Sequence, residues 1–207
     1  MKKINYIFPE LSISEPVILV GNSPSNLLKE NGNIIDQFKT VIRFNDNQIQ
    51  GYEKHIGKKT DLVFINNGVY PSFKPHQNEK IILIDNSLQK NFNNFKPEFK
   101  DHFLLDPNAI LFLRYKYGPF KNFLRFLHYR GTWINLIYPK LITIGTIVSL
   151  LLIENDIKFT ITGMDLNYKK NNSHYFKNAS QENNEKNFYL EKKILIPFIK
   201  SRKIDIL

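Results

Sequence analysis

The amino-acid sequence predicts an α/β fold, a single Rossmann-like domain with a mainly parallel sheet flanked by helices. Short apolar segments of strand character recur along the chain, and each one ends in polar residues. Stretches with helical character separate these segments, and the length of 207 residues suits one domain with one core. Parallel sheets that are covered by helices on both faces have such apolar strands, and they bind ligands at the carboxyl ends of the strands.

The first predicted strand is Val17-Ile-Leu-Val20, and it leads into the turn Gly21-Asn-Ser-Pro-Ser25. Gly21 lets the backbone approach a ligand closely, and Pro24 suits the first position of a helix, where its missing N–H costs nothing. A strand, a tight turn and a helix N-terminus are the arrangement with which open α/β sheets hold a nucleotide. The segment therefore predicts a ligand class together with a fold.

A helix and three more strands are predicted in the first half of the chain. The helix covers 26–37 with a break at 31–33, and the strands cover 40–44, 61–65 and 80–85. Asn45 and Asn66 come at the ends of the first two of these strands, so they are expected at the same edge of the sheet as the turn after Val20.

The segment 103–138 interleaves aromatic, aliphatic and basic residues. It is either a pair of helices packed on the core with solvated arginines, or a lid, an acceptor platform or a membrane-contacting surface, because basic residues beside exposed aromatic ones suit an anionic interface. The sequence leaves both interpretations open.

The last third of the chain resumes the alternation of helices and strands. An apolar helix over 143–153 opens with Thr and Gly, a strand over 158–162 runs into Gly163-Met-Asp-Leu-Asn-Tyr168, and a charged helix over 182–200 precedes a strand over 203–207. A polar loop that contains His174 lies between the strand and the charged helix.

The formal net charge of +10 predicts an anionic partner, which could be an anionic small substrate, a membrane surface or nucleic acid. Nucleic acid is disfavoured because the basic residues are scattered and form no recognisable binding motif. The chain has no cysteine, which excludes disulfides, thiol catalysis and thiolate metal sites. No uninterrupted apolar run approaches the roughly 20 residues that span a bilayer, and no secretory segment is evident, so we expect a cytoplasmic protein with peripheral contact at the inner face of the cell membrane.

Four segments are expected to meet at the carboxyl edge of the sheet: 21–25, 43–47, 143–146 and 163–168. The carboxamides of Asn22 and Asn45 can donate to and accept from a cytosine edge or a sugar hydroxyl, or they can cap turns. Thr143 and Thr146 flank Gly145 at a helix N-terminus, which suits either a phosphate or carboxylate ligand or a helix cap.

His174 is the best titratable candidate, because a histidine in a polar loop beside Tyr175 can act as an acid or base near neutral pH. The alternative is an exposed histidine without a role. The sequence has no P-loop, no nucleophile elbow, no Asp-x-Asp and no spacing typical of metal ligands, so no metal is expected.

Three motifs in order resemble those of the sialyltransferases. Residues 18–23, 35–45 and 51–60 together resemble the long sialylmotif of the animal-type family, glycosyltransferase family 29, and 18–25 also resembles the start of the bacterial family 42 enzymes. Residues 143–151 with 162–165 resemble the short sialylmotif, and Ser173-His-Tyr175 resembles the small motif with the family's histidine base. Two departures are the missing cysteine pair and Phe176-Lys177 after the small motif, where a further Tyr and Glu are usual.

The resemblance implies one glycosyltransferase domain over 1–207, with the GT-A-like variant of the Rossmann-like fold. It implies inverting, metal-independent transfer of sialic acid or a related ulosonate such as Kdo from its CMP-sugar, with no further cofactor and with His174 as general base. The acceptor would be a glycan or lipid-linked glycan of the cell surface, in bacterial lipopolysaccharide or capsule biosynthesis, and the alternative is a CMP-sugar-binding module without transfer activity. The oligomeric state stays open. The substrate-binding residues that the resemblance and the edge positions give are Gly21, Asn22, Ser23, Asn45, Asn66, Thr143, Gly145, Thr146, Gly163, Asp165, Tyr168 and Tyr175.

Overall fold

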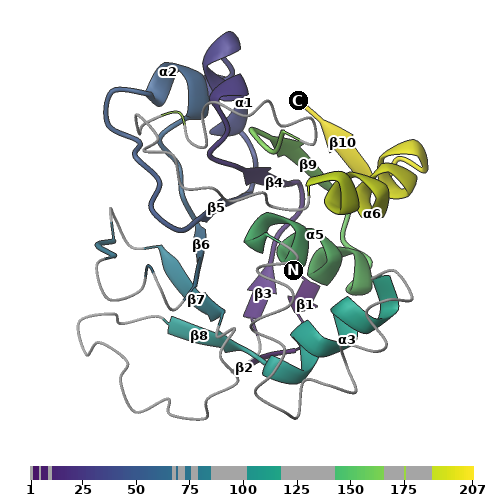
Figure 1. Cartoon of the computed structure of the whole chain (residues 1–207). Helices are drawn as coiled ribbons and strands as arrows, with labels where there is room; N and C mark the ends of the chain where they lie inside the picture. The colour runs from purple at the N-terminus through teal and green to yellow at the C-terminus, as the bar shows by residue number, and fades with distance from the viewer. Residues whose placement is uncertain are drawn as a thin grey trace.

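An eight-stranded sheet organises the part of the chain that this computed structural model describes, which comprises residues 2–4, 6–8, 11–66, 69, 73–75, 79–84, 102–117, 143–165, 175 and 188–207. The strand order is β10-β9-β4-β5-β6-β7-β8-β2 (Figure 1). The strands are β2 (Ile7–Phe8), β4 (Val17–Val20), β5 (Thr40–Phe44), β6 (Leu62–Asn66), β7 (Lys80–Ile84), β8 (His102–Leu105), β9 (Phe159–Thr162) and β10 (Ile204–Ile206). A separate antiparallel pair joins β1 (Lys2–Ile4) to β3 (Leu11–Ile13).

Strand order reverses at β4, which fixes where a ligand is expected. From β4 the chain adds β5, β6, β7 and β8 on one side, and it then returns to place β9 and β10 on the other side. All these neighbours pair in parallel, and β2 pairs with β8 in the antiparallel sense. In open α/β sheets the ligand binds outside the carboxyl ends of the strands at such a reversal. The ends of β4 and β9 therefore mark the expected site.

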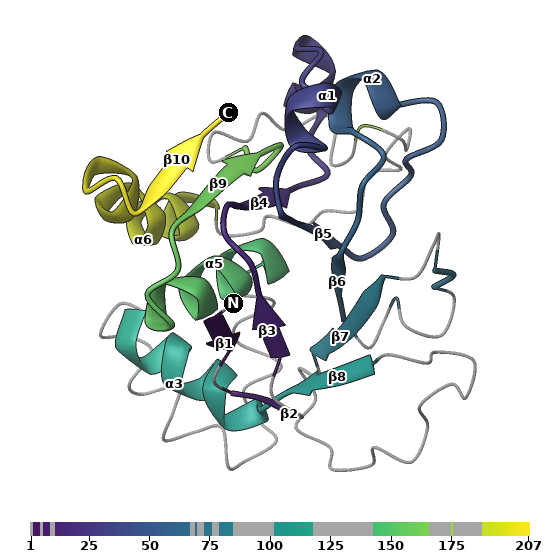
Figure 2. The same cartoon turned by 180° about the vertical axis from the view of Figure 1, so that it is seen from behind.

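Helices cover both faces of the sheet (Figures 1 and 2). The first face carries α3 (Pro107–Tyr117), α5 (Ile144–Glu154) and α6 (Phe188–Lys200), whose buried residues join the largest apolar cluster. The second face carries the short helices η1 (Pro24–Leu28), α1 (Gly32–Ile35) and α2 (Glu53–Ile56). Side chains of a strand alternate between faces, and β4 follows this rule, since Leu19 joins the α5 cluster while Ile18 and Val20 join Ile35 and Ile56.

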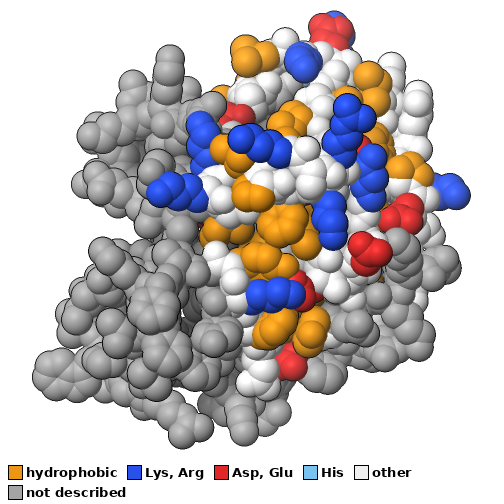
Figure 3. Space-filling view, turned by 90° about the vertical axis from the view of Figure 1, so that its right-hand side faces the viewer, with side chains coloured by type: hydrophobic (Ala, Val, Ile, Leu, Met, Phe, Trp, Pro, Cys, Tyr) orange, Lys and Arg blue, Asp and Glu red, His pale blue; other side chains and the backbone are white. Residues whose placement is uncertain are grey.

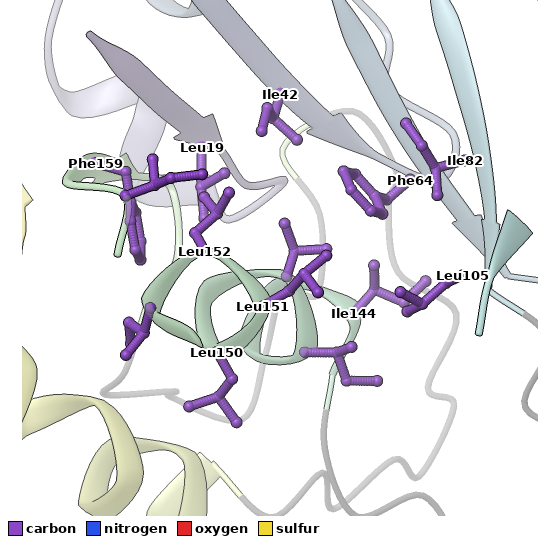
Figure 4. Close-up of a cluster of buried hydrophobic side chains, with 14 of the residues drawn as sticks. Leu19, Ile42, Phe64, Ile82, Leu105, Ile144, Leu150, Leu151, Leu152 and Phe159 are labelled. Carbon is purple, nitrogen blue, oxygen red and sulfur yellow. The ribbon is translucent and has the colours of Figure 1, made fainter. Parts of the chain in front are cut away.

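Helix α5 is the centre of the core, and every residue from Ile144 to Ile153 is buried. Figure 4 shows Leu151 and Leu152 pointing to the sheet, where Leu19, Ile42 and Phe64 lie. Full burial of one such side chain stabilises the fold by about 1.5–3 kcal/mol. The position of the α5 N-terminus beneath the sheet is therefore strongly determined.

The structure confirms the predicted fold class and has a strand at each of the six predicted positions, with differences elsewhere in the chain. The helix expected over 26–37 with a break at 31–33 is two short helices, η1 and α1, and the break lies at 29–31. Gly32 is inside α1, which lies so close to α2 that a Cβ on Gly32 would stand 2.0 Å from the carbonyl oxygen of Glu53. Within 103–138, residues 103–105 belong to strand β8, 107–117 form α3, and 118–138 lie outside the described residues. The pairing of β1 with β3 was not predicted at all.

Candidate functional site at the carboxyl edge of the sheet

Asn22, two residues after the end of β4, ties two strand ends together. Its Nδ2 donates to the carbonyl oxygen of Phe44 and to that of Asp46, each at 3.0 Å. Both donor hydrogens of the carboxamide are thus used to hold the turn after β5 against the end of β4. The side chain caps a turn, and only its Oδ1 remains for a ligand.

Asn45 repeats this arrangement one strand along. Its backbone has φ 50°, in the left-handed region that asparagine tolerates better than most residues. Its Oδ1 accepts a hydrogen bond from the backbone N–H of Asn66 at 3.1 Å, and its own N–H donates to the carbonyl of Phe64 at 2.8 Å. The Oδ1 of Asn66 in turn accepts from the N–H of Val69 at 2.9 Å.

Each asparagine keeps one amide atom that bonds to no other described residue. These atoms are Oδ1 of Asn22, Nδ2 of Asn45 and Nδ2 of Asn66, and all three residues are half-buried. The backbone partners determine which end of each carboxamide is oxygen, so one acceptor and two donors are held in fixed orientations. Such a set suits a nucleotide, whose base and ribose offer both acceptors and donors.

The ends of β4 and β9 are bonded to one another by backbone groups. Gly21 donates to the carbonyl of Thr162 at 2.8 Å and Ser23 donates to that of Gly163 at 3.0 Å, while the N–H of Asp165 donates to Ser23 Oγ at 3.3 Å. A Cβ on Gly21 would stand 2.1 Å from the carbonyl oxygen of Gly163. The missing side chain of Gly21 therefore makes room for the β9 loop. The expectation that a ligand also approaches Gly21 stays a prediction.

Asn26 was not singled out by the sequence analysis, although it holds this junction together. It is buried, its Nδ2 donates to the carbonyl of Gly21 at 2.7 Å, and its Oδ1 accepts from the hydroxyl of Thr162 at 3.2 Å. A Cβ on Gly163, which has φ 61°, would meet Asn26 Nδ2 at 2.1 Å. The only sequence signal for Asn26 was its position inside a predicted helix near the first turn.

The N-terminus of α5, where the sequence predicted a phosphate or carboxylate, holds a carboxylate of the chain itself. Glu191 of α6 is buried, and it accepts hydrogen bonds from the backbone N–H of Thr143 and, at 3.2 Å, from the hydroxyl of Thr143. Thr143 also caps the helix by accepting from the N–H of Thr146. The predicted helix cap by Thr143 is confirmed, while a ligand anion at this helix end stays a prediction. The helix dipole favours the carboxylate of Glu191, and nothing in the sequence showed that α6 supplies it.

Gly145 and Thr146 are not open to solvent in this arrangement. Thr146 is 0 % exposed, and a Cβ on Gly145 would meet the Cε of Met164 at 2.8 Å. The end of the flexible Met164 side chain covers this turn of α5. Any ligand group that reaches the turn has to move Met164 or Glu191.

Arg43 is a buried cation that the sequence analysis did not assign. It lies on β5, 1 % exposed, and it donates from Nε to Thr60 Oγ1 at 2.9 Å and from Nη2 to the carbonyls of Ile56 at 2.7 Å and Lys59 at 3.0 Å. Burial lowers the pKa of Arg43 to about 10, although Tyr175 and Asp36 act in the opposite direction. These hydrogen bonds fasten residues 56–60, at the end of α2 and after it, to strand β5.

Tyr175 is buried among apolar side chains of the second face. Its phenol donates to the carbonyl of Gln48 at 2.8 Å, its N–H donates to the carbonyl of Asn22 at 3.0 Å, and its ring meets that of Tyr52 edge-on at 4.9 Å. Burial raises the pKa of Tyr175 above its ordinary value, more than the charge of Arg43 lowers it. These contacts favour an anchoring role for a residue that was predicted to bind substrate.

Two predicted site residues, Tyr168 and His174, lie outside the described residues. Within the described ranges, no group of three or more His, Asp and Glu side chains is arranged to hold a metal ion. No helix in the same ranges is long and apolar enough to cross a membrane.

Comparison with known proteins supports the resemblance seen in the sequence. Residues 15–101 match the family model of glycosyltransferase family 29 (sialyltransferase). Among curated proteins, a β-1,6-galactosyltransferase of Arabidopsis thaliana, GALT29A, is 39% identical over 51 residues, which is 25% of this chain. The chain spans only 13% of the length of that relative.

Sialyltransferases are among the solved structures that are similar to the chain. A mammalian sialyltransferase in complex with Gal-β-1-3GalNAc-ortho-nitrophenol superposes with a TM-score of 0.61 at 19% identity, and the match covers 92% of this chain and 68% of that one. Campylobacter jejuni CstII in complex with cytidine-5'-monophosphate gives 0.56 at 20% identity, over 95% and 80% of the two chains. The relatives come from a plant, a mammal and a bacterium, so they leave the expectation of a bacterial source untested.

Proposed function

From a sialyltransferase fold and a match to the family 29 model over 15–101, we propose that the chain is a glycosyltransferase that takes its sugar from a CMP-activated donor. The observation that carries the proposal is the trio of oriented amide atoms on Asn22, Asn45 and Asn66 at the reversal of strand order. One acceptor and two donors, held by backbone bonds at the edge where α/β sheets bind nucleotides, fit a cytidine and its ribose. CstII is described in complex with CMP, which supports the same ligand class.

The proposed base is His174. The N–H of Tyr175, one peptide bond after His174, lies 3.0 Å from the carbonyl of Asn22, so the sequence neighbour of the base is fixed at the end of β4. In the proposed reaction an imidazole nitrogen of His174 takes the proton of the acceptor hydroxyl as the acceptor oxygen bonds to the anomeric carbon. The bond from that carbon to the phosphate oxygen breaks on the opposite face, and CMP leaves with the electron pair, which inverts the configuration.

Sialic acid or a related ulosonate is the sugar we propose, and a glycan or a lipid-linked glycan is the proposed acceptor. The mammalian structure is described with a disaccharide derivative, which supports a glycan acceptor. A galactosyl donor is the second candidate, because the curated relative is a β-1,6-galactosyltransferase. We also propose that transfer requires no metal, since the sequence has no Asp-x-Asp motif.

The test begins with thermal stabilisation of the full chain by CMP, UMP and AMP, followed by hydrolysis and transfer assays with CMP-sialic acid, CMP-Kdo and UDP-galactose. We expect stabilisation by CMP above the other nucleotides and turnover of a CMP-sugar that survives EDTA. Selective stabilisation by UMP with turnover of UDP-galactose would favour the second candidate. CMP binding without turnover on any acceptor would indicate a binding module that has lost transfer activity.

The role of His174 has its own test. His174→Ala should leave the dissociation constant of CMP within about twofold and lower kcat by at least about 100-fold, the range in which general bases contribute. His76→Ala, the same change at a histidine outside the sialylmotif-like segments, is the control. Equal turnover of the two variants would exclude His174 as the base.

A further inference from the structure

The outer face of α6 and the turn that follows it carry a concentration of positive charge. Residues 193–203 contain Lys193, Lys200, Arg202 and Lys203 and no acidic residue, and all four side chains are exposed. Figure 3, which shows the side of the molecule at the right of Figure 1, has hydrophobic side chains gathered in the middle and Lys and Arg side chains around them.

Helix α6 is amphipathic: one side packs on the core and the opposite side faces solvent. Ile194 and Leu195 are buried in the core cluster, while Lys193, Ile196, Pro197 and Lys200 recur at the spacing of one helical stripe. Of these four, Lys193, Pro197 and Lys200 are exposed and Ile196 is half-buried. Apolar side chains therefore stand between cations on the outer stripe.

Two of the four cations, Lys200 and Arg202, have no carboxylate partner among the described residues. Lys203 lies 3.9 Å from Asp156, a contact between side chains that are 53% and 95% exposed, and such pairs contribute little. Lys200 and Arg202 form no ion pair with any other described residue. Lys200 and Arg202 thus keep positive charges that no described carboxylate pairs with.

Arg202 occupies a backbone position that usually takes glycine. Its φ is 57°, and the N–H groups of Arg202 and Lys203 donate at 3.0 Å to the carbonyls of Ile199 and Phe198, which is the Schellman ending of a helix. An arginine in the left-handed region costs folding free energy that a glycine would not.

We propose that the outer face of α6 and its following turn bind an anionic lipid surface. Four cations on and after an amphipathic helix, with apolar side chains among them, match the pattern by which peripheral proteins hold anionic bilayers. The exposed apolar area is small, so binding is mainly electrostatic and weakens with salt. The proposed contact lies on α6 and not in segment 103–138, where the sequence suggested a membrane contact. Lipid binding can be tested without a transfer assay.

The test is co-sedimentation of the full chain with phosphatidylcholine vesicles that either contain or lack phosphatidylserine. Each Lys or Arg near an anionic surface strengthens binding roughly fivefold, so Lys200→Ala with Arg202→Ala should weaken it roughly 25-fold. Lys39→Ala with Lys58→Ala removes the same charge from exposed residues beside α1 and α2 and should weaken binding by less than about threefold. Equal losses in the two double variants, or equal binding to neutral vesicles, would overturn the proposal.

Arg202→Gly separates lipid binding from folding. It relieves the left-handed backbone, so the Tm should be unchanged or higher while vesicle binding falls roughly fivefold, and Arg202→Lys should restore the binding. Two results assign the face to another partner and overturn the proposal. One is a concentration-dependent dimer that the Lys200/Arg202 double variant abolishes, and the other is binding to duplex DNA that is tighter than to vesicles at the same salt.

Discussion

The backbone N–H of Tyr175 donates a hydrogen bond to the carbonyl oxygen of Asn22 across 3.0 Å. The phenol of Tyr175 donates to the carbonyl of Gln48, and its ring packs against Tyr52. One residue thus joins the loop that follows β9 to the ends of β4 and β5. Because Tyr175 follows His174, this anchor determines where the segment with the proposed base meets the sheet.

Tyr175→Phe should lower the free energy of unfolding by about 1 kcal/mol at pH 7, because it removes one buried hydrogen bond and keeps the ring. Urea denaturation measures the change, and Tyr6→Phe, at a side chain that is 39% exposed, is the control and should change nothing. Equal stability of the two variants would show that the bond to Gln48 contributes nothing.

The difference in the free energy of unfolding between the wild type and Tyr175→Phe should also depend on pH in the alkaline range. Burial raises the pKa of Tyr175 in the folded chain, so above pH ~10 the unfolded chain loses the phenol proton first. The unfolded state then binds fewer protons, and stability falls as pH rises. The wild type should therefore lose about 1.4 kcal/mol of stability relative to Tyr175→Phe between pH 8 and pH 11. This exceeds its advantage of about 1 kcal/mol at pH 7, so the variant should be slightly the more stable of the two at pH 11. An advantage that stays constant over this range would contradict the raised pKa.

Asn45→Asp tests the Nδ2 of Asn45, which we assign to the ligand, separately from its Oδ1, which accepts a hydrogen bond from the backbone of Asn66. The aspartate keeps an oxygen to accept from the N–H of Asn66 and tolerates the left-handed backbone, but it loses the Nδ2 donor and adds a negative charge. We expect the free energy of unfolding to change by less than about 0.5 kcal/mol and the affinity for CMP to fall at least tenfold, or about 1.4 kcal/mol.

Isothermal titration with CMP measures this loss. The matched control is Asn33→Asp, which makes the same change in charge at an exposed residue of α1. If both variants bind CMP as the wild type does, Asn45 does not contact the nucleotide.

The sequence was enough to place Asn22, Asn45 and Asn66 together, because strand ends of a parallel sheet share an edge and the strands were recognisable from their apolar runs. It could not show which amide atom of each side chain bonds to the backbone, since this depends on the register of neighbouring strands. Glu191 was unpredictable for a related reason. Its carboxylate reaches Thr143 from a helix 48 residues further along, and nothing local marks it.

Gly21→Ala tests whether the end of β4 packs directly against the β9 loop. The added Cβ would stand 2.1 Å from the carbonyl oxygen of Gly163. A Cβ has a fixed position on its backbone and the carbonyl is itself backbone, so no side-chain rotation can relieve the strain. We expect a loss of about 3 kcal/mol or more in the free energy of unfolding.

Gly51→Ala is the control for this change. Gly51 has φ 86° and nothing within 4 Å of the new Cβ, so only its backbone conformation is penalised, by about 1–2 kcal/mol. Similar losses in the two variants would mean that the steric contact with Gly163 is absent. Thermal or urea denaturation of both variants gives the comparison.

Glu191→Gln tests the carboxylate that occupies the N-terminus of α5. The glutamine keeps an oxygen for the N–H of Thr143 but loses the negative charge that the helix dipole favours, so the free energy of unfolding should fall by about 1 kcal/mol.

Glu191→Gln should also change the affinity for CMP. The proposed donor carries a negative phosphate, and the carboxylate of Glu191 at the same edge of the sheet either repels this phosphate or has to move away from it. Affinity for CMP should therefore rise about fivefold in this variant, which corresponds to about 1 kcal/mol. Glu30→Gln removes the same charge from an exposed residue paired with Lys54 and should leave the CMP affinity unchanged. An equal gain in both variants would reflect net charge alone, and an unchanged CMP affinity in Glu191→Gln would mean that the donor phosphate binds away from α5.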